Sequence, residues 1–377
     1  MSDNLILRPY HSPRLTTPNR VVMAPMTRYR ADEDGVPQPF VADYYAQRAT
    51  AGLIITEGIW PSYRGQSGWR ISGLVTDAHV AGWRRVTDAV HAAGGRIFAQ
   101  LMHGGRKGHP LNRIDGSVPL APSPVVDPER QHTPVGKREP VVPVPMSHAD
   151  IAQAVADYAA AARNAIRAGF DGVEIHGANS YLIHQFLADN TNLRTDEYGG
   201  DIPGRMRFAL EVVEAVTAEI GAGRTAIRLS PGNPQFGMVE KNPGPLYRAL
   251  VDALNRYDLA YLHLSQTGEY PALAELRPRW NGPLIANVGE NGPPTSAQAG
   301  DALIRDGLAD LVSYGRAFIA NPDLVHRFTV GAPLADYNPD LLYTHGVEGY
   351  ADYPPLPAPS APAEEPVTQA SATAAPR

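Results

Sequence analysis

The sequence predicts a (β/α)₈ barrel with a long excursion after the third strand. Eight apolar runs of strand length occur in the 377 residues, helix-length patterns alternate with them, and polar side chains gather just after the strands. Alternation with short connections favours a parallel sheet, and eight such units favour closure into a barrel over an open sheet. The clearest strand end lies in Val173 to Gly200, where an apolar run stops at His176, Asn179 and Tyr181.

The predicted strands are short apolar runs followed by loop or helix signals. In chain order we predict strands at Val21 to Pro25, Leu53 to Thr56, Arg96 to Leu101, Gly172 to Ile175, Thr225 to Leu229, Ala260 to Leu264, Leu284 to Ala286 and Leu311 to Val312.

Helix-length patterns fill the gaps between these strands. The best marked runs from Ser147 to Ala168 and opens with a Ser-x-x-Asp capping box at Ser147 and Asp150. The other predicted helices span Asp77 to Ala93, Arg205 to Ile220, Pro245 to Tyr257 and Thr295 to Asp306.

Two segments fall outside this alternation. Residues 106–145 follow the third strand, are rich in Pro and are too long for a plain connection, so we predict an excursion over the barrel mouth. Residues 354–377 contain almost no large apolar side chains and cannot offset their ordering entropy by burial. We therefore expect one barrel domain over residues 1–353 and a disordered tail.

Composition excludes several classes of chemistry. The chain has no Cys, which rules out disulfides, zinc–thiolate sites, iron–sulfur clusters and thiol nucleophiles, and no metal site is predicted. Redox chemistry would therefore require a bound cofactor. The net charge is −6, with no basic stripe for nucleic acid and no apolar stretch long enough for a membrane span or signal peptide. A cytoplasmic protein is expected.

The carboxyl ends of barrel strands all lie on one face, so polar residues that follow them should converge. The residues at issue are Thr27 and Arg28, His103 and Arg106, His176, Asn179 and Tyr181, Arg228 and Ser230, and Tyr314, Gly315 and Arg316. Five such strand ends on one rim are hard to explain by packing alone. Gly289 after strand seven, with Gly315 and Arg316 after strand eight, fits the usual phosphate site of a barrel.

Several ordered motifs resemble the flavin-dependent ene-reductases called Old Yellow Enzymes. They are NRVVMAPMTR at Asn19 to Arg28, HGGR at His103 to Arg106, HGANSYLIHQFL from His176, NLRTDEYGG from Asn192, and EGYADYP at Glu348 to Pro354. The resemblance spans nearly the whole chain except the tail. The two central motifs are the most specific.

The resemblance implies a tightly bound, non-covalent FMN at the top of the barrel. Pro25, Met26 and Thr27 would line the isoalloxazine, and Gly58 would offer a backbone N–H to the same edge. Gln100 and Arg228 would contact the pyrimidine ring, where a cation stabilises the charge that develops on reduction. The FMN phosphate would be bound by Val288, Gly289, Gly315 and Arg316.

The resemblance also implies the substrate side of the site. His176 and Asn179 would bind a carbonyl or nitro oxygen, and Tyr181 would deliver a proton to the α carbon, because a phenol with an ordinary pKa of about 10 is protonated at neutral pH. Tyr350 and Met102 would border the substrate pocket. NADPH or NADH would serve as reductant.

Four positions qualify what the resemblance implies. Met102 stands where many members have a Trp that shapes the substrate cavity, which predicts a roomier or softer pocket. Ser180 replaces a common Gly and Gly58 a frequent Ala, and neither should abolish flavin binding. Thr27 indicates the Thr-containing subclass, and the lack of Cys argues against the larger relatives with an iron–sulfur cluster.

We therefore expect an FMN-containing, NAD(P)H-dependent reductase of activated alkenes, as a monomer or small homo-oligomer, with possible action on nitro compounds or nitrate esters. Two other functions stay open at this point. A flavin-free barrel lyase would need a catalytic Lys at a strand end, and none is found at the eight predicted ends. A flavoprotein with a binding or sensing role is not separable from an enzyme by sequence.

Overall fold

Eight parallel strands close into a barrel in the computed structural model, which describes residues 4–289 and 295–357. In chain order they are β3 (Val21–Met23), β4 (Leu53–Ile59), β5 (Ile97–Leu101), β10 (Gly172–Gly177), β11 (Thr225–Leu229), β12 (Leu262–Gln266), β13 (Leu284–Val288) and β14 (Leu311–Tyr314). Each strand pairs with the next, and β14 pairs with β3 to complete the ring. The predicted (β/α)₈ barrel is confirmed.

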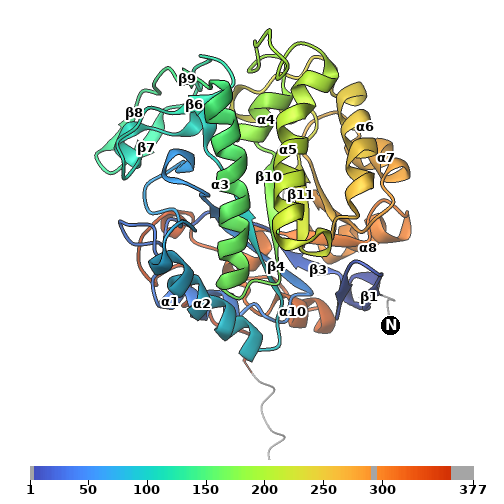
Figure 1. The fold of residues 1–377 in the computed structure, drawn as a ribbon. Coiled ribbons are helices and arrows are strands. Elements are labelled where there is room, and N and C mark those ends of the chain that lie inside the picture. The colour runs from blue at the N-terminus through green and yellow to red at the C-terminus, as the bar shows by residue number, and fades with distance from the viewer. Residues whose placement is uncertain (1–3, 290–294, 358–377) are drawn as a thin grey trace, which may run out of the picture.

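The helices lie outside the strands, as Figure 1 shows for α3 and α5 in front of β10 and β11. Their bounds are α1 (Phe40–Ala46), α2 (Asp77–Ala92), α3 (His148–Arg167), α4 (Leu182–Leu187), α5 (Ile202–Ile220), α6 (Pro243–Leu254), α7 (Ala272–Leu276), α8 (Ala297–Arg305), α9 (Arg316–Ala320) and α10 (Leu324–Val330). Single 3₁₀ turns are η1 (Leu5–Leu7), η2 (Tyr63–Gly65), η3 (Gly105–Lys107), η4 (Pro110–Asn112), η5 (Ala222–Arg224), η6 (Gln235–Gly237), η7 (Asn255–Tyr257), η8 (Arg277–Arg279) and η9 (Pro339–Leu341).

The capping box predicted before α3 is present. The Ser147 hydroxyl accepts the Asp150 backbone N–H, and the Asp150 carboxylate accepts the Ser147 backbone N–H in return. These two bonds satisfy donors that a helix start otherwise leaves unpaired. The five longer predicted helices correspond to α2, α3, α5, α6 with η7, and α8, whereas α1, α4, α7, α9 and α10 were too short to be marked by periodicity.

The interior of the barrel is layered. Its lower part is apolar, with Val22, Ile55, Phe98 and Ile285 packed in one cluster that also takes in Leu15 of the N-terminal loop. That loop connects β1 (Tyr10–His11) to β2 (Thr16–Thr17), and the two strands form a small antiparallel sheet. Polar side chains begin above this layer, toward the carboxyl ends of the strands, so the barrel presents its chemistry at one end only.

The excursion after β5 carries two small sheets. They are β6 (Leu120–Ala121) with β9 (Val144–Pro145), and the hairpin of β7 (Gln131–Thr133) and β8 (Gly136–Arg138). Figure 1 shows these strands gathered at one end of the molecule. The cavity described below is lined in part by this excursion, through Arg130, Gln131, His132 and Thr133.

The chain from Tyr337 to Tyr353 returns to the mouth of the barrel and is anchored by two arginines. Arg28 donates hydrogen bonds to the carbonyls of Leu342 and Gly349, and Arg30 donates to four carbonyls between Leu341 and Glu348. The predicted disordered tail, residues 354–377, lies outside the described residues from 358 onward. Among the described helices, none is both long enough and apolar enough to span a membrane.

Candidate active site

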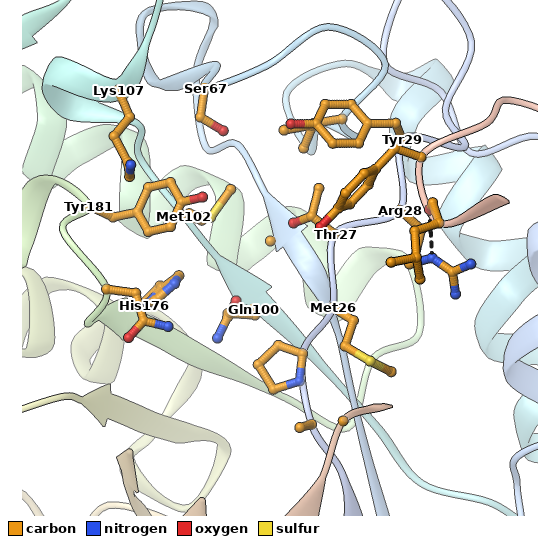
Figure 2. Close-up of a pocket in the computed structure, with 18 of the residues that line it drawn as sticks. Met26, Thr27, Arg28, Tyr29, Ser67, Gln100, Met102, Lys107, His176 and Tyr181 are labelled. Carbon is orange, nitrogen blue, oxygen red and sulfur yellow. Dashed lines mark hydrogen bonds between the residues drawn. The ribbon is translucent and has the colours of Figure 1, made fainter. Parts of the chain in front are cut away.

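A cavity of about 860 Å³ opens at the carboxyl end of the barrel. Its walls come from strand ends, from the excursion hairpin and from the C-terminal segment, and Figure 2 shows His176 and Tyr181 on one side with Met26 and Thr27 across from them. Most of the predicted site residues line it together: Pro25, Met26, Thr27, Gly58, Gln100, Met102, His176, Asn179, Tyr181, Arg228, Val288, Gly289, Gly315 and Arg316. A volume of this size is typical of ligand and cofactor pockets.

His176, at the end of β10, is held as a neutral ring that donates from one nitrogen. Its Nδ1 accepts the backbone N–H of Ala178 at 3.3 Å, which assigns the ring hydrogen to Nε2. Burial lowers the pKa of His176 well below its usual range, and the nearby positive charge of Arg228 lowers it further. The side chain can therefore donate a hydrogen bond from Nε2 without being charged.

Asn179 is oriented by a second asparagine. Its Oδ1 accepts a hydrogen bond from Nδ2 of Asn233 at 3.0 Å, so the amide nitrogen is the end that can donate to another group. The Asn179 backbone N–H donates to the Ser230 hydroxyl at 2.9 Å, which ties the turn after β10 to the end of β11. Asn233 is a site residue that the sequence did not single out.

The turn that presents Asn179 contains two residues in the left-handed region, Asn179 at φ 51° and Ser180 at φ 67°. The Ser180 hydroxyl is buried and has no hydrogen-bond partner among the described residues. A Gly, which is common here in the family that the sequence resembles, would remove the cost of the left-handed backbone at position 180 and the cost of the buried hydroxyl.

We predict that Ser180→Gly raises the free energy of unfolding by about 1 kcal/mol. Urea titration measures this change, and a free energy of unfolding below that of the parent would contradict the prediction.

Tyr181 follows this turn and immediately precedes α4. Its ring centroid lies 4.8 Å from that of His176, with the two planes tilted by 48°. Figure 2 shows the Tyr181 ring projecting into the pocket beside Met102 and below Lys107. The His176 ring, the Asn179 amide and the Tyr181 phenol are therefore presented to one region of the cavity.

Gln100 and Arg228 lie deeper, where β5 and β11 reach the cavity. Nη2 of Arg228 donates to Oδ1 of Asn287 at 2.8 Å, and Nδ2 of Asn287 donates to the carbonyl of Ser313 at 3.2 Å. The Arg228 Nε is buried without a hydrogen-bond partner in the described part of the chain. An unpaired buried guanidinium nitrogen at a cavity wall indicates that a ligand supplies the missing acceptor.

Gly58 of β4 and Met102, the residue that follows β5, are neighbours. The pairing of β4 with β5 shifts register between Ile55 and Gly58, which is how β4 runs on to Ile59 beyond the predicted end. A Cβ added at Gly58 would lie 2.4 Å from the Met102 sulfur. The two departures from the family pattern noted in the sequence are therefore linked, because the Met102 side chain uses the space that Gly58 leaves.

Tyr350 is not among the residues that line the cavity, contrary to its predicted place in the substrate pocket. Its ring is 1% exposed and stacks on Tyr44 at 3.8 Å, with Arg28 and Arg30 near its face. It anchors the C-terminal segment. The cavity side of that segment is formed by residues that sequence reasoning missed: Tyr337, Leu342, Tyr343 and His345.

His103 and Arg106 also lie on the predicted rim without lining the cavity. The Arg106 guanidinium donates to the carbonyls of Phe236 and Val126, and its backbone N–H donates to Gln185. His103 accepts the backbone N–H of Gly105 at Nδ1. The HGGR motif therefore supports the surrounding loops.

The burial of His103 predicts a pH dependence of stability. Burial, and secondly the charge of Arg113, lowers the pKa of His103 to about 3, against about 6.5 in an unfolded chain. As pH falls from about 6.5 toward 3, the unfolded chain takes up a proton that the folded chain does not, so stability decreases.

Replacing His103 by Asn should reduce the proton uptake on unfolding by about one over this range. Urea unfolding measured at a series of pH values gives this number. Equal pH dependence in the parent and the variant would contradict the assignment.

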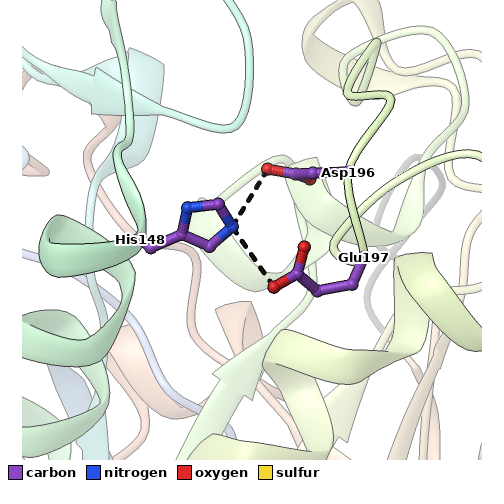
Figure 3. A group of neighbouring side chains, drawn as sticks. All are labelled: His148, Asp196 and Glu197. Carbon is purple, nitrogen blue, oxygen red and sulfur yellow. Dashed lines mark ion pairs between the residues drawn. The ribbon is translucent and has the colours of Figure 1, made fainter.

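A further group of titratable side chains lies away from the cavity. Nε2 of His148 is 3.5 Å from Asp196 and 3.3 Å from Glu197. Figure 3 shows both carboxylates facing the His148 ring. The three could in principle hold a metal ion. However, Arg194 pairs with both oxygens of Asp196, and the Asp196 carboxylate also accepts the Tyr198 backbone N–H. The carboxylate is thus already used to shape the loop after α4.

Comparison with known proteins decides the family. The model of the NADH:flavin oxidoreductase / NADH oxidase family matches residues 7–335. The chain belongs to this family. It is 41% identical to 12-oxophytodienoate reductase 7 of Oryza sativa subsp. japonica over 93% of this chain and 94% of that protein. It is 42% identical to a "probable flavin mononucleotide-dependent alkene reductase" of Leishmania infantum, over 89% and 93%.

Solved structures of the family superpose on this NADH:flavin oxidoreductase over nearly their full length. An Old Yellow Enzyme homologue from Zymomonas mobilis has a TM-score of 0.89 and 40% identity, covering 93% of this chain and 99% of that one. Morphinone reductase in complex with tetrahydroNAD has a TM-score of 0.88 and 42% identity, covering 93% and 98%. The chain is an FMN-dependent oxidoreductase that takes hydride from NAD(P)H and reduces activated C=C bonds.

The residues of the cavity fit FMN. Arg228 offers a buried Nε–H that no described residue accepts, and Gln100 also lines this part of the cavity. At another wall, Arg316 donates to the Gly289 carbonyl, and a Cβ added at Gly315 would lie no closer than 3.6 Å to Met26. Packing within this oxidoreductase therefore does not require glycine at 315, and the space there suits an anionic ligand beside an arginine.

Proposed function

We propose that both half-reactions take place in this one cavity, with NAD(P)H and an activated alkene binding in turn. The observation that carries the proposal is the arrangement of donors. The Ala178 N–H assigns the ring hydrogen of His176 to Nε2, and the bond from Asn233 to Oδ1 of Asn179 leaves the amide nitrogen of Asn179 as its donor end. Both residues line the same cavity as Gln100 and Arg228, so substrate and flavin would lie in contact.

The residues proposed to hold FMN divide the cavity into two parts. Gln100 and Arg228 would bind the pyrimidine ring, and Pro25, Met26, Thr27 and Gly58 would line the isoalloxazine. Val288, Gly289, Gly315 and Arg316 would bind the phosphate. Bound there, FMN supplies a centre that accepts hydride from NAD(P)H and passes it to the β carbon of the alkene.

His176 and Asn179 would polarise the substrate. Two hydrogen bonds to a carbonyl or nitro oxygen withdraw electron density from the conjugated C=C bond and stabilise the negative charge that develops on that oxygen. A neutral imidazole suits this task because it donates without transferring its proton, and the lowered pKa of His176 supports a neutral ring. Donors that the protein already holds in place also need no reorganisation when the charge develops, so no free energy is spent on orienting them.

Tyr181 would supply the proton. Its ring lies beside His176, so a substrate oxygen bound by His176 and Asn179 would bring the α carbon within the range of the phenol. Hydride would arrive at the β carbon and the proton at the α carbon, which completes reduction of the C=C bond.

The substrate class proposed is α,β-unsaturated carbonyl compounds and nitroalkenes, with nitro compounds and nitrate esters as further substrates. Several relatives are named for carbonyl compounds, the 12-oxophytodienoate reductases and morphinone reductase. A nitro group offers the same oxygen acceptors. Met102, unbranched and flexible, would allow substituted alkenes to fit against β5.

Steady-state kinetics test the single shared site. Initial rates with NADPH and 2-cyclohexen-1-one, each varied at several fixed levels of the other, should give parallel double-reciprocal lines, and high alkene should inhibit competitively against NADPH. Intersecting lines without mutual competition would mean that both molecules bind together, which contradicts the shared cavity.

A further inference from the structure

A buried polar layer lies inside the barrel between the apolar cluster and the cavity. It consists of Gln100, Glu174, His263 and Ser313, contributed by β5, β10, β12 and β14, and we call it the polar layer. Gln100 Nε2 donates to Glu174 Oε1 at 2.8 Å, His263 Nδ1 lies 2.9 Å from Glu174 Oε2, and His263 Nε2 lies 2.9 Å from the Ser313 hydroxyl. The side chains of Glu174 and His263 are both 0% exposed.

The Glu174 carboxyl is ionised. Burial raises its pKa, but His263, Arg228 and Gln100 together outweigh burial, so the pKa of Glu174 is lowered overall. Tyr261, also buried beside it, is neutral, because burial and the Glu174 charge raise its pKa well above 10. His263 and Arg228 are therefore the side chains that favour the ionised form of Glu174.

The polar layer reaches the cavity through Gln100. An ionised carboxylate can only accept, so it fixes the NH₂ end of the Gln100 amide toward Glu174 and leaves Oε1 as the end that can face the cavity. Gln100 Oε1 can then accept an N–H from a bound ring. The backbone pairing puts Glu174 opposite Gln100, and Arg228 opposite His263, which keeps these contacts in register.

Packing does not account for these residues. The layer below is filled by Val22, Ile55, Phe98 and Ile285, which shows that this barrel can fill its interior with apolar side chains. A buried ion pair is often no more stabilising than apolar side chains of similar volume. Glu174 contacts the cavity residue Gln100 directly, and the charge of Arg228, a second cavity residue, acts on Glu174, so the place of the pair points to the flavin site.

We propose that Glu174 and His263 are positioning residues for the flavin. The pair fixes the amide orientation of Gln100, and its charges set the electrostatic potential beside Arg228 at the pyrimidine end of the cavity. This inference rests on the proposed placement of Gln100 and Arg228 at that ring. Neither Glu174 nor His263 lines the cavity, so both act through their neighbours.

The reduction potential of bound FMN in the holoenzyme tests the proposal. Reduction adds negative charge to the flavin, so E174Q, which removes an anion near it, should shift the potential to a more positive value. We expect the affinity for reduced over oxidised FMN to rise about tenfold, equal to about 30 mV for a two-electron couple. H263Q, which leaves the Glu174 anion without its partner, should shift the potential in the opposite direction.

Three further variants make the result specific. The double variant E174Q/H263Q should lie between the single variants, and E174D, which keeps the charge, should stay near the parent. E240Q is a matched control, because it breaks another buried carboxylate–histidine contact, Glu240 with His184 at 3.6 Å, whose two residues do not line the cavity. It should lower stability without moving the potential.

An E174Q potential equal to that of the parent, shifts of the same sign in E174Q and H263Q, or an equal shift in E240Q would overturn the proposal. If E174Q does not fold, the comparison of H263Q with E174D takes its place. A negative shift of the potential in H263Q and no shift in E174D support the proposal, and any other result overturns it. Failure of the parent protein to bind FMN would instead overturn the proposed function.

Discussion

Replacing both His176 and Asn179 with Ala is expected to lower kcat/KM for 2-cyclohexen-1-one by about 10³-fold, because one preorganised donor to a developing oxyanion is typically worth 10²–10³. The two donors are fixed by separate contacts, from Ala178 N–H and from Asn233. Phenolic ligands, which present an oxygen to the same donors, should bind correspondingly more weakly. Steady-state kinetics and spectral titration with a phenol measure the two effects.

A graded control accompanies this variant. Asn233→Ala leaves both donors in place. It removes the contact that orients Asn179 and a bond that Asn233 accepts from the Gln235 backbone N–H, so its effect should be clearly smaller than that of the double variant. FMN content should stay unchanged in both. Unaltered phenol binding in the double variant would rule out His176 and Asn179 as the oxygen-binding pair.

Replacing Tyr181 with Phe should slow the alkene half-reaction by about 10²-fold while sparing the reduction of FMN by NADPH, since loss of a general acid typically costs 10²–10⁴. The ring itself is retained, so the contact with His176 is preserved. Stopped-flow spectroscopy separates the two steps, because the flavin band falls in the first and recovers in the second.

Tyr343→Phe is the matched control for this measurement. Tyr343 lines the same cavity but is 61% exposed and belongs to the C-terminal segment. Loss of its hydroxyl should change the rate of neither half-reaction by more than about twofold, which is far below the effect of losing a general acid. A Tyr181→Phe variant that turns over alkene at the parent rate would remove Tyr181 from the role of proton donor.

The barrel could be predicted from the sequence because its strands are apolar runs that end in polar side chains. Leu53 to Thr56 and Thr225 to Leu229 have that form, and both are strands in the structure. The predicted end of β4 at Thr56 was too early, because β4 passes through a register shift before Gly58. Nothing in local hydrophobicity marks such an irregularity.

The cavity residues divide by the kind of signal that they leave in the sequence. His176 and Arg228 follow or end apolar runs, so they could be found. Asn287 directly follows such a run and Asn233 lies in the loop after β11, but the role of each is to orient another side chain, which depends on contacts across the barrel.

Glu174 and His263 were overlooked for a different reason. Each is a single polar residue inside an apolar strand, and such a residue is taken for an ordinary interruption until the closed barrel brings the two within 2.9 Å. Tyr350 shows the opposite error. Its motif lies in the segment that returns to the barrel mouth, but no residue of Glu348 to Pro354 lines the cavity, and the Tyr350 ring stacks on Tyr44 in the core.

The anaerobic visible spectrum of the purified protein tests the central claim most directly, recorded alone, then with NADPH, then with 2-cyclohexen-1-one. The account predicts a flavin band that bleaches on addition of NADPH and returns on addition of the alkene, so that both half-reactions are seen in one sample. A colourless protein that cannot be reconstituted with FMN would contradict it.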